Sequence, residues 1–297
     1  MKKQMQANLL LVLTAFIWGS AFVAQSAGMD YVRPFTYNMS RNVLGFLVLL
    51  PVIYLLNRKK GTGLGEILLP DRLTLIGGIC CGVVLAVASG FQQYGVSMTT
   101  AGKAGFITAL YIILVPVFSS FLGKKPPRVI WLCVVIALVG FYLLCVKEGF
   151  TISTGDLLVL CCAFCFTAHI LVISHFSGKG TDGVKMSCIQ FAVAGLLSAV
   201  PALIWEHPSL QQITTAWLPI AYAGIMSSGV AYTLQIVAMK DAEPTTATLI
   251  MSLESVFAAL SGWLILGEQL SGKELLGCIL VFAAVILAQA PLPSRKQ

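Results

Sequence analysis

The sequence predicts an all-α integral membrane protein of ten transmembrane helices, arranged as two inverted five-helix repeats. Three observations lead to this prediction. Of the 297 residues, 58% are hydrophobic and only 10% are charged, whereas about 25% of a typical soluble domain is charged. Apolar runs of about 20 residues, the length that crosses a bilayer as a helix, recur ten times. Two of these runs also align with each other, five spans apart.

The predicted spans follow one another with short connections, which leave no room for a soluble domain. They cover residues 8–25, 34–56, 73–95, 103–123, 128–146, 156–176, 184–205, 216–238, 245–266 and 272–290. Pro116 lies inside the fourth span. Because proline removes a backbone hydrogen bond, we expect this helix to kink or to be broken near the membrane midplane.

The basic residues predict how the spans are oriented. If the amino terminus lies in the cytoplasm, 14 of the 19 Lys and Arg residues fall in inner segments, 4 fall in outer segments, and Arg41 falls within a span. Cytoplasmic loops carry an excess of Lys and Arg, so we expect both termini in the cytoplasm and the protein in the cytoplasmic membrane. The net charge of +7 then serves topology and the anionic inner leaflet of the lipid bilayer, and nucleic acid is not an expected partner.

An internal repeat predicts the division of the chain. Residues 108–122 (TALYIILVPVFSSFL) align without gaps on residues 247–261 (ATLIMSLESVFAALS), which places the fourth span on the ninth. An odd number of spans per repeat inverts the second copy, and inverted repeats are a common build of secondary transporters. We therefore expect two five-helix units, residues 1–150 and 151–297, with a site near the midplane between them.

Glu254 lies near the middle of the ninth span, where a carboxylate costs roughly 2.5–3.5 kcal/mol on insertion scales. Small and polar residues share its helical face, whereas leucines occupy the opposite face. Glu254 should therefore face protein or water rather than lipid. Substrate contact, proton coupling and a structural hydrogen bond between helices all fit this position, and the sequence leaves the choice open.

Arg41 lies within the second span and is a candidate for binding a substrate carboxylate or for pairing with Glu254. The alternative is an arginine that snorkels to the outer interface or pairs structurally. The two residues stand at comparable depth in different repeats. We therefore expect Arg41 and Glu254 to line one cavity.

Aromatic and amide side chains within or at the ends of the spans could form a cage for a small solute, although Tyr and Trp also mark membrane interfaces. The predicted substrate-binding residues are Trp18, Asn38, Arg41, Gln92, Tyr111, Tyr232, Gln235 and Glu254. His169 in the sixth span is, with Glu254, a candidate for proton coupling. Its alternative role is that of a core residue with its hydrogen bonds satisfied.

Motifs for catalysis or for cofactor binding are missing from the sequence. It contains no glycine-rich phosphate loop, no His-x-x-Glu-His pattern and no Gly-x-Ser-x-Gly elbow. The nine cysteines lie in apolar runs and are interpreted as small core residues. We therefore expect no enzyme, no cofactor and no metal site. A proton, another ion or a substrate gradient would have to drive any energy-coupled transport.

Several motifs together resemble the EamA-type carriers of the drug/metabolite transporter superfamily. They are Trp18-Gly19-Ser20-x-Phe22, Arg41, TAGKAGFIT at residues 100–108 through Pro116, and LESVFAALSGWLILGE at residues 253–268. The resemblance covers essentially the whole chain. It departs at Ser255, where the family pattern often has proline, and at residues 123–127, where the end of the fourth span is shortened and lacks a glutamate.

This resemblance implies two inverted five-helix halves, a central cavity and alternating access. Members of the family move amino acids, other metabolites or toxic organic compounds, frequently outward. We therefore expect a secondary transporter of a small organic solute, amino-acid-like or amphipathic, that works as an exporter. The alternative is a membrane-embedded lipid-modifying enzyme or a non-transporting scaffold. Substrate, coupling ion and a homodimeric state are left open.

Overall fold

The computed structural model describes residues 2–58, 69–99, 101–123, 126–145, 153–266 and 271–289, and all secondary structure in these ranges is helical. This confirms the prediction of an all-α protein for the described part of the chain. The boundary expected near residue 150 and the Gly267-Glu268 end of the last motif lie outside these ranges.

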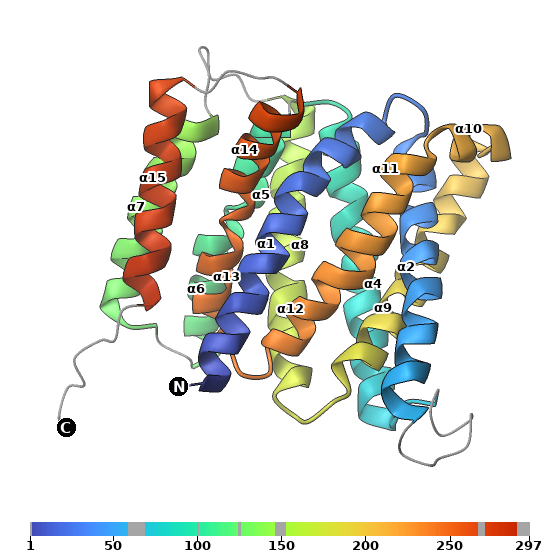
Figure 1. Cartoon of the computed structure of the whole chain (residues 1–297), viewed down its shortest axis with the longest axis horizontal. Helices are drawn as coiled ribbons and strands as arrows, with labels where there is room; N and C mark the ends of the chain where they lie inside the picture. Colours follow the sequence, from blue (N-terminus) through green and yellow to red (C-terminus); the bar gives the residue numbers. More distant parts are fainter. Residues whose placement is uncertain are drawn as a thin grey trace.

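The helices follow the order of the predicted spans. Up to residue 145 they are α1 (Lys2–Gly28), α2 (Pro34–Asn57), α4 (Arg72–Val96), α5 (Ala101–Thr108), α6 (Tyr111–Phe121) and α7 (Arg128–Cys145). From residue 153 they are α8 (Thr154–Ser177), α9 (Gly183–Pro201), η2 (Ala202–Glu206), α10 (Leu210–Thr215), α11 (Trp217–Ala221), η3 (Tyr222–Tyr232), α12 (Thr233–Ala238), α13 (Pro244–Met251), α14 (Glu254–Leu266) and α15 (Gly272–Gln289). In Figure 1 they form one bundle, with α7 and α15 side by side at one end.

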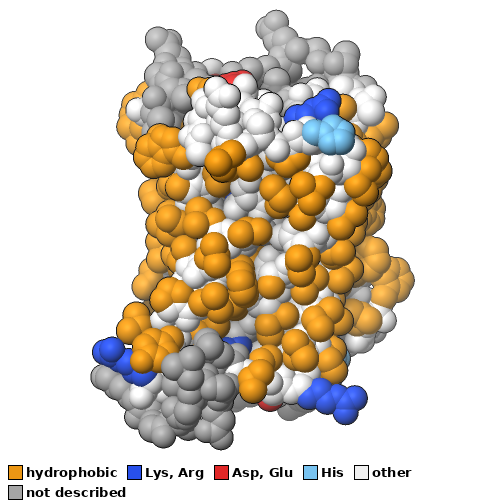
Figure 2. Space-filling model, turned by 90° about the vertical axis from the view of Figure 1, so that its right-hand side faces the viewer, with side chains coloured by type: hydrophobic (Ala, Val, Ile, Leu, Met, Phe, Trp, Pro, Cys, Tyr) orange, Lys and Arg blue, Asp and Glu red, His pale blue; other side chains and the backbone are white. Residues whose placement is uncertain are grey.

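Length and composition show which helices can cross a membrane. Among the described residues, six helical segments are long and apolar enough: Lys3–Gly28, Pro34–Asn57, Arg72–Val96, Thr154–Ser177, Gly183–Glu206 and Trp217–Ala238. Tyr111–Phe121 and Arg128–Leu143 are shorter apolar helices. Figure 2 shows one face of the bundle, where hydrophobic side chains fill the middle and Lys and Arg lie toward the ends. This is the surface that a bilayer requires of a protein embedded in it.

The fourth and ninth spans are each broken into two helices. The fourth breaks at the turn of Ala109 and Leu110, between α5 and α6, and the ninth at Ser252 and Leu253, between α13 and α14. The break in the fourth span was expected, but it does not lie at Pro116, which remains within α6. Residues 252–253 align with residues 113–114 in the repeat, so the two breaks are displaced by about one helical turn.

Local hydrogen bonds account for the break in the ninth span. The hydroxyl of Ser252 donates to the Leu249 carbonyl at 2.6 Å, and that of Thr248 donates to the Thr245 carbonyl at 2.8 Å. Such side chains compete with the backbone for its carbonyl oxygens. The backbone N–H of Leu253 then bonds three residues back, to the Ile250 carbonyl at 3.1 Å. The turn leaves Glu254 as the first residue of α14.

Two close approaches fix α1 and α2 against the carboxyl-terminal part of the chain. A Cβ added to Gly19 on α1 would lie 2.5 Å from the carbonyl oxygen of Glu254, so only glycine allows α1 to pass the start of α14. At the start of α2, the carboxylate of Glu206 accepts from the backbone N–H groups of Phe35 and Thr36 at 3.0 and 2.7 Å. These N–H groups have no intrahelical partner in the first turn, so Glu206 from η2 caps α2.

The segment Tyr222–Tyr232 forms a π-helix, η3, which the sequence did not lead us to expect. π-helices are rare in proteins, and those that occur are often found at functional sites. Gly224 in η3 has no room for a side chain, because a Cβ there would lie 2.8 Å from Leu44 on α2. The wide turns of η3 change which of its side chains face the interior of the bundle.

Candidate functional site

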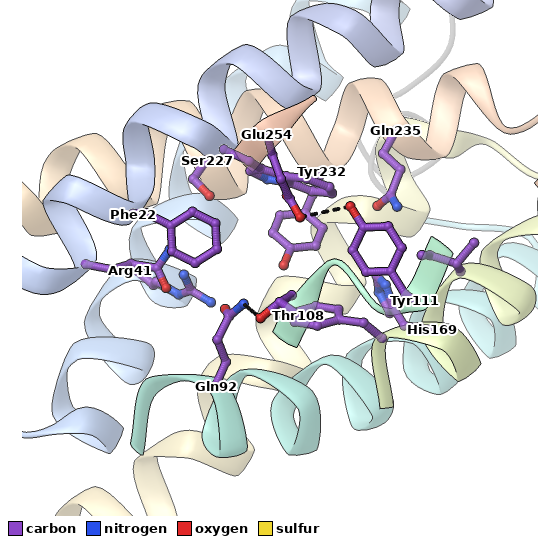
Figure 3. A pocket seen from close by; sticks show the side chains of 14 residues that line it. Phe22, Arg41, Gln92, Thr108, Tyr111, His169, Ser227, Tyr232, Gln235 and Glu254 are labelled. Atoms are coloured by element: carbon purple, nitrogen blue, oxygen red, sulfur yellow. Dashed lines mark hydrogen bonds between the residues drawn. The ribbon is translucent and has the colours of Figure 1, made fainter. Parts of the chain in front are cut away.

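A cavity with an empty volume of about 470 Å³ lies inside the bundle, and Figure 3 shows the side chains that surround it. They come both from helices that precede residue 146 and from helices that follow residue 152. The lining residues are Trp18, Phe22, Gln25, Arg41, Gln92, Thr108, Tyr111, Phe166, His169, Ile170, Ser227, Tyr232, Gln235 and Glu254.

Most residues singled out in the sequence meet at this cavity. Those that line it are Trp18, Arg41, Gln92, Tyr111, His169, Tyr232, Gln235 and Glu254. Asn38 is not among the lining residues. It is fully buried, and its Nδ2 donates to the Ser89 carbonyl at 2.8 Å, which ties α2 to α4.

The two broken helices meet at one hydrogen bond in the cavity wall. Tyr111 is the first residue of α6 and Glu254 the first of α14. The Tyr111 hydroxyl donates to Oε1 of Glu254 at 2.8 Å, as Figure 3 shows. The start of a helix carries partial positive charge, which favours a carboxylate. Glu254 therefore receives two kinds of stabilisation inside the bundle, from a hydroxyl and from the start of α14.

Arg41 supplies a positive charge to the same cavity. Its side chain is 2% exposed, and its Nε has no hydrogen-bond partner. Within the described ranges, no ion pair joins Arg41 to Glu254 or to another carboxylate. In Figure 3, Arg41 lies on one side of the cavity with Phe22, away from the pair of Glu254 and Tyr111. The cavity thus presents one cation and one carboxylate that face it separately.

Aromatic side chains form much of the remaining wall. The rings of Trp18 and Tyr232 are 4.6 Å apart, and the ring of His169 lies 5.9 Å from that of Tyr232. Phe166 packs against His169 at 6.3 Å. Edge-to-face and tilted contacts of this kind hold aromatic rings in fixed relative positions. They also give the cavity an apolar surface between its charged groups.

Amide side chains complete the polar part of the site. Gln92 Nε2 donates to the hydroxyl of Thr108 at 3.5 Å, and Gln235 Nε2 donates to Sδ of Met251, also at 3.5 Å. His169 Nε2 lies 2.8 Å from Oε1 of Gln190. Groups of His, Cys, Asp and Glu that could hold a metal ion are not found among the described residues. The wall of the cavity thus combines two separate opposite charges with amides and aromatic surface.

Six lining residues were missed by the sequence analysis: Phe22, Gln25, Thr108, Phe166, Ile170 and Ser227. Helical spacing could have found some of them. Phe22 and Gln25 follow Trp18 by four and seven residues, and Phe166 precedes His169 by three, which places each on the face of a predicted residue. Ser227 carried no such signal, because it lies in η3, where the α-helical period does not apply.

A bundle of apolar helices around a cavity with charged and aromatic walls is typical of a multi-pass membrane protein. Comparison with known proteins places it more narrowly. The chain belongs to the EamA-like transporter family, whose model matches it twice, over residues 5–146 and 153–289. It is therefore a transporter by family.

Individual relatives agree with this assignment. An uncharacterized transporter of Archaeoglobus fulgidus is 32% identical over 287 residues, which cover 96% of this chain and 86% of that protein. The threonine/homoserine exporter RhtA of Salmonella typhimurium is 30% identical over 182 residues, 58% of this chain and 57% of RhtA. A solved crystal structure with 19% identity covers 95% of this chain and 96% of its own, with a TM-score of 0.77, and so shares the fold.

Proposed function

We propose that the protein is a secondary transporter that carries a small organic solute, amino-acid-like or amphipathic, across the cell membrane by alternating access, and that it works as an exporter. One observation carries the proposal: Arg41 and Glu254 line one cavity without forming an ion pair. Buried charges are expensive unless they are paired. A zwitterionic solute pairs both, with its carboxylate on Arg41 and its ammonium group on Glu254.

The arrangement of the broken helices supports two inverted units, residues 1–150 and 151–297. In Figure 1, α5 lies beside α14 and α6 beside α13, and the two broken spans run in opposite directions. The beginning of α1 and the end of α15 lie at the same end of the bundle, as expected if both ends of the chain are cytoplasmic. In such transporters the positive starts of half-helices point at anionic groups. Tyr111 and Glu254 hold these positions here, and the carboxylate of Glu254 is itself the anion at the start of α14.

The way the wall is divided supports alternating access. Arg41, Gln92 and Tyr111 belong to the first unit, whereas His169, Tyr232 and Glu254 belong to the second. Rocking of one unit against the other would therefore open the cavity to one side of the membrane at a time. Glu254 and His169 line the wall from the second unit and are the candidates for coupling to a proton.

RhtA supports the choice of solute and direction, because its name describes an exporter of two amino acids. The test is counterflow in proteoliposomes that contain the purified protein. Vesicles preloaded with unlabelled amino acid should take up the same labelled amino acid faster than vesicles without protein. Absence of counterflow for every amino acid, amine and small metabolite in the panel would overturn the proposal. Consumption of a lipid without flux would point to an enzyme instead.

A further inference from the structure

His169 has a fixed partner behind the cavity wall. The ring lines the cavity from α8, and its Nε2 lies 2.8 Å from Oε1 of Gln190 on α9. Both side chains are 0% exposed, and Gln190 does not line the cavity. The contact therefore holds the ring from the side that the solute does not reach.

The chemistry of this contact decides what His169 presents to the cavity. The Gln190 amide is assigned with Oε1 toward the ring and with its own Nε2 buried without a partner among the described residues. A carbonyl oxygen only accepts hydrogen bonds, so in this orientation Nε2 of His169 carries the proton and donates. In a neutral imidazole the other nitrogen is then an acceptor. That nitrogen, Nδ1, is buried and has no hydrogen-bond partner in the described part of the chain. The contact with Gln190 thus leaves Nδ1 of His169 as a hydrogen-bond acceptor without a donor.

Gln235 offers a second acceptor on the same side of the cavity. Gln235 follows Tyr232 by three residues and so shares its face, and the ring of Tyr232 is 5.9 Å from that of His169. The amide nitrogen of Gln235 donates to Met251, which leaves its Oε1 directed elsewhere, buried and without a partner. In Figure 3, Gln235 and His169 lie with Tyr111 on the side of the cavity away from Arg41. This end is therefore rich in uncharged acceptors.

We propose that this end of the cavity selects solutes whose side chain ends in an uncharged hydrogen-bond donor, a hydroxyl or a carboxamide. His169 is the specificity-determining residue, and Gln190 is a positioning residue that keeps Nδ1 free to accept. The inference rests on the proposed function, since Arg41 and Glu254 bind the charged part of the same solute. A solute with an apolar side chain of the same shape leaves a buried acceptor unpaired, which is unfavourable.

The test compares pairs of amino acids with similar shapes. Threonine and valine differ by a hydroxyl in place of a methyl group, and asparagine and leucine by an amide in place of two methyl groups. Isothermal titration calorimetry on the purified wild type gives Kd for each. We expect threonine to bind about tenfold more tightly than valine, and asparagine about tenfold more tightly than leucine. The reason is that the apolar member of each pair leaves a buried acceptor unpaired, which costs about one hydrogen bond.

Variants separate selectivity from general damage, because the ratio of two Kd values cancels a uniform loss of affinity. His169→Leu should bring both ratios to about one, whereas His169→Asn, whose side-chain oxygen reaches the place of Nδ1, should keep part of the preference. Gln190→Leu should lower the ratios because the ring proton is then free to move to Nδ1. Ser187→Ala is the matched control: it removes another buried hydrogen bond from α9, the 2.7 Å contact with Thr233, and should keep the wild-type ratios.

The outcomes distinguish this inference from the function beneath it. If amino acids bind but the wild type shows no preference within either pair, the selectivity proposal is wrong and the proposed function stands. An unchanged preference in His169→Leu likewise overturns the assignment to His169. If no amino acid binds at all, both proposals fail.

Discussion

The two broken helices resemble each other in form and differ in chemistry. Each breaks inside the bundle, and each sends the first residue of its second half into the cavity wall. The first supplies a neutral hydroxyl, Tyr111, and the second a carboxylate, Glu254. Arg41 on α2 adds a cation to the same wall. The cavity wall thus carries opposite charges at two places, which is the basis of the proposed zwitterionic solute.

The largest loss of affinity should come from removing the carboxylate of Glu254, the charged group at the second break. Glu254→Ala leaves the ammonium group of a bound zwitterion unpaired in a buried site, which typically costs about 3 kcal/mol or about 100-fold in Kd. Calorimetry with the best amino acid measures the loss. Glu243→Gln is the control, because it removes an exposed carboxylate at the start of α13, outside the cavity. If both variants change Kd equally, Glu254 does not bind the solute.

Glycines beside the two breaks should respond differently to an added methyl group. Gly19→Ala places a Cβ 2.5 Å from the Glu254 carbonyl, and overpacking of this kind typically costs about 1–3 kcal/mol of stability. A Cβ at Gly105 in α5 meets nothing within 4 Å, so Gly105→Ala should be neutral or stabilising by up to about 1 kcal/mol. Thermal unfolding in detergent compares the two. A lower Tm for Gly105→Ala than for Gly19→Ala would contradict the packing described.

The hydrogen bond between the breaks should contribute to affinity. Tyr111→Phe removes the donor to Glu254, and a hydrogen bond to a charged group contributes roughly 1.5–3 kcal/mol. Because water or solute can replace part of it in a cavity, we expect the lower end, about tenfold in Kd. Tyr37→Phe is matched, since its hydroxyl donates to the Pro219 carbonyl at 3.2 Å and Tyr37 lies outside the cavity. The prediction fails if the two variants weaken binding equally.

Asn38 should give the smallest effect on binding. Asn38→Ala removes the 2.8 Å bond to the Ser89 carbonyl, and the loss should be about 1 kcal/mol of stability. Its effect on Kd should be smaller than that of Tyr111→Phe. Parallel thermal unfolding and calorimetry measure both quantities. A loss of affinity as large as that of Glu254→Ala would show that Asn38 takes part in binding the solute.

Charged residues in apolar spans were the most informative part of the sequence. Glu254 and Arg41 could be placed in a shared interior from the cost of burying charge alone, and both line the cavity. Asn38 came from a different signal, an amide that could belong to a solute cage. In the structure its Nδ2 donates to the Ser89 carbonyl, and its Oδ1 is buried without a partner in the described ranges. The number of membrane crossings and the inversion of the two units stay predictions.

Other features depend on contacts that a single sequence does not reveal. The fourth span breaks at Ala109 and Leu110 rather than at Pro116, in a turn whose backbone bonds run three residues back, as from Ile112 N–H to the Ala109 carbonyl at 3.0 Å. Gln190, the partner of His169, lies on another helix with no motif to link them. Ser227 reaches the cavity from a π-helix, whose period differs from the one used to assign faces.

The central claim is that one cavity binds the two opposite charges of one solute. Competition in proteoliposome counterflow tests it directly, with a transported amino acid, its amide (which lacks the carboxylate charge) and its N-acetyl derivative (which lacks the ammonium charge). We predict that the amino acid competes fully and that each derivative competes at least about 100-fold less well, since each leaves Arg41 or Glu254 unpaired. Equal competition by all three compounds would contradict the account.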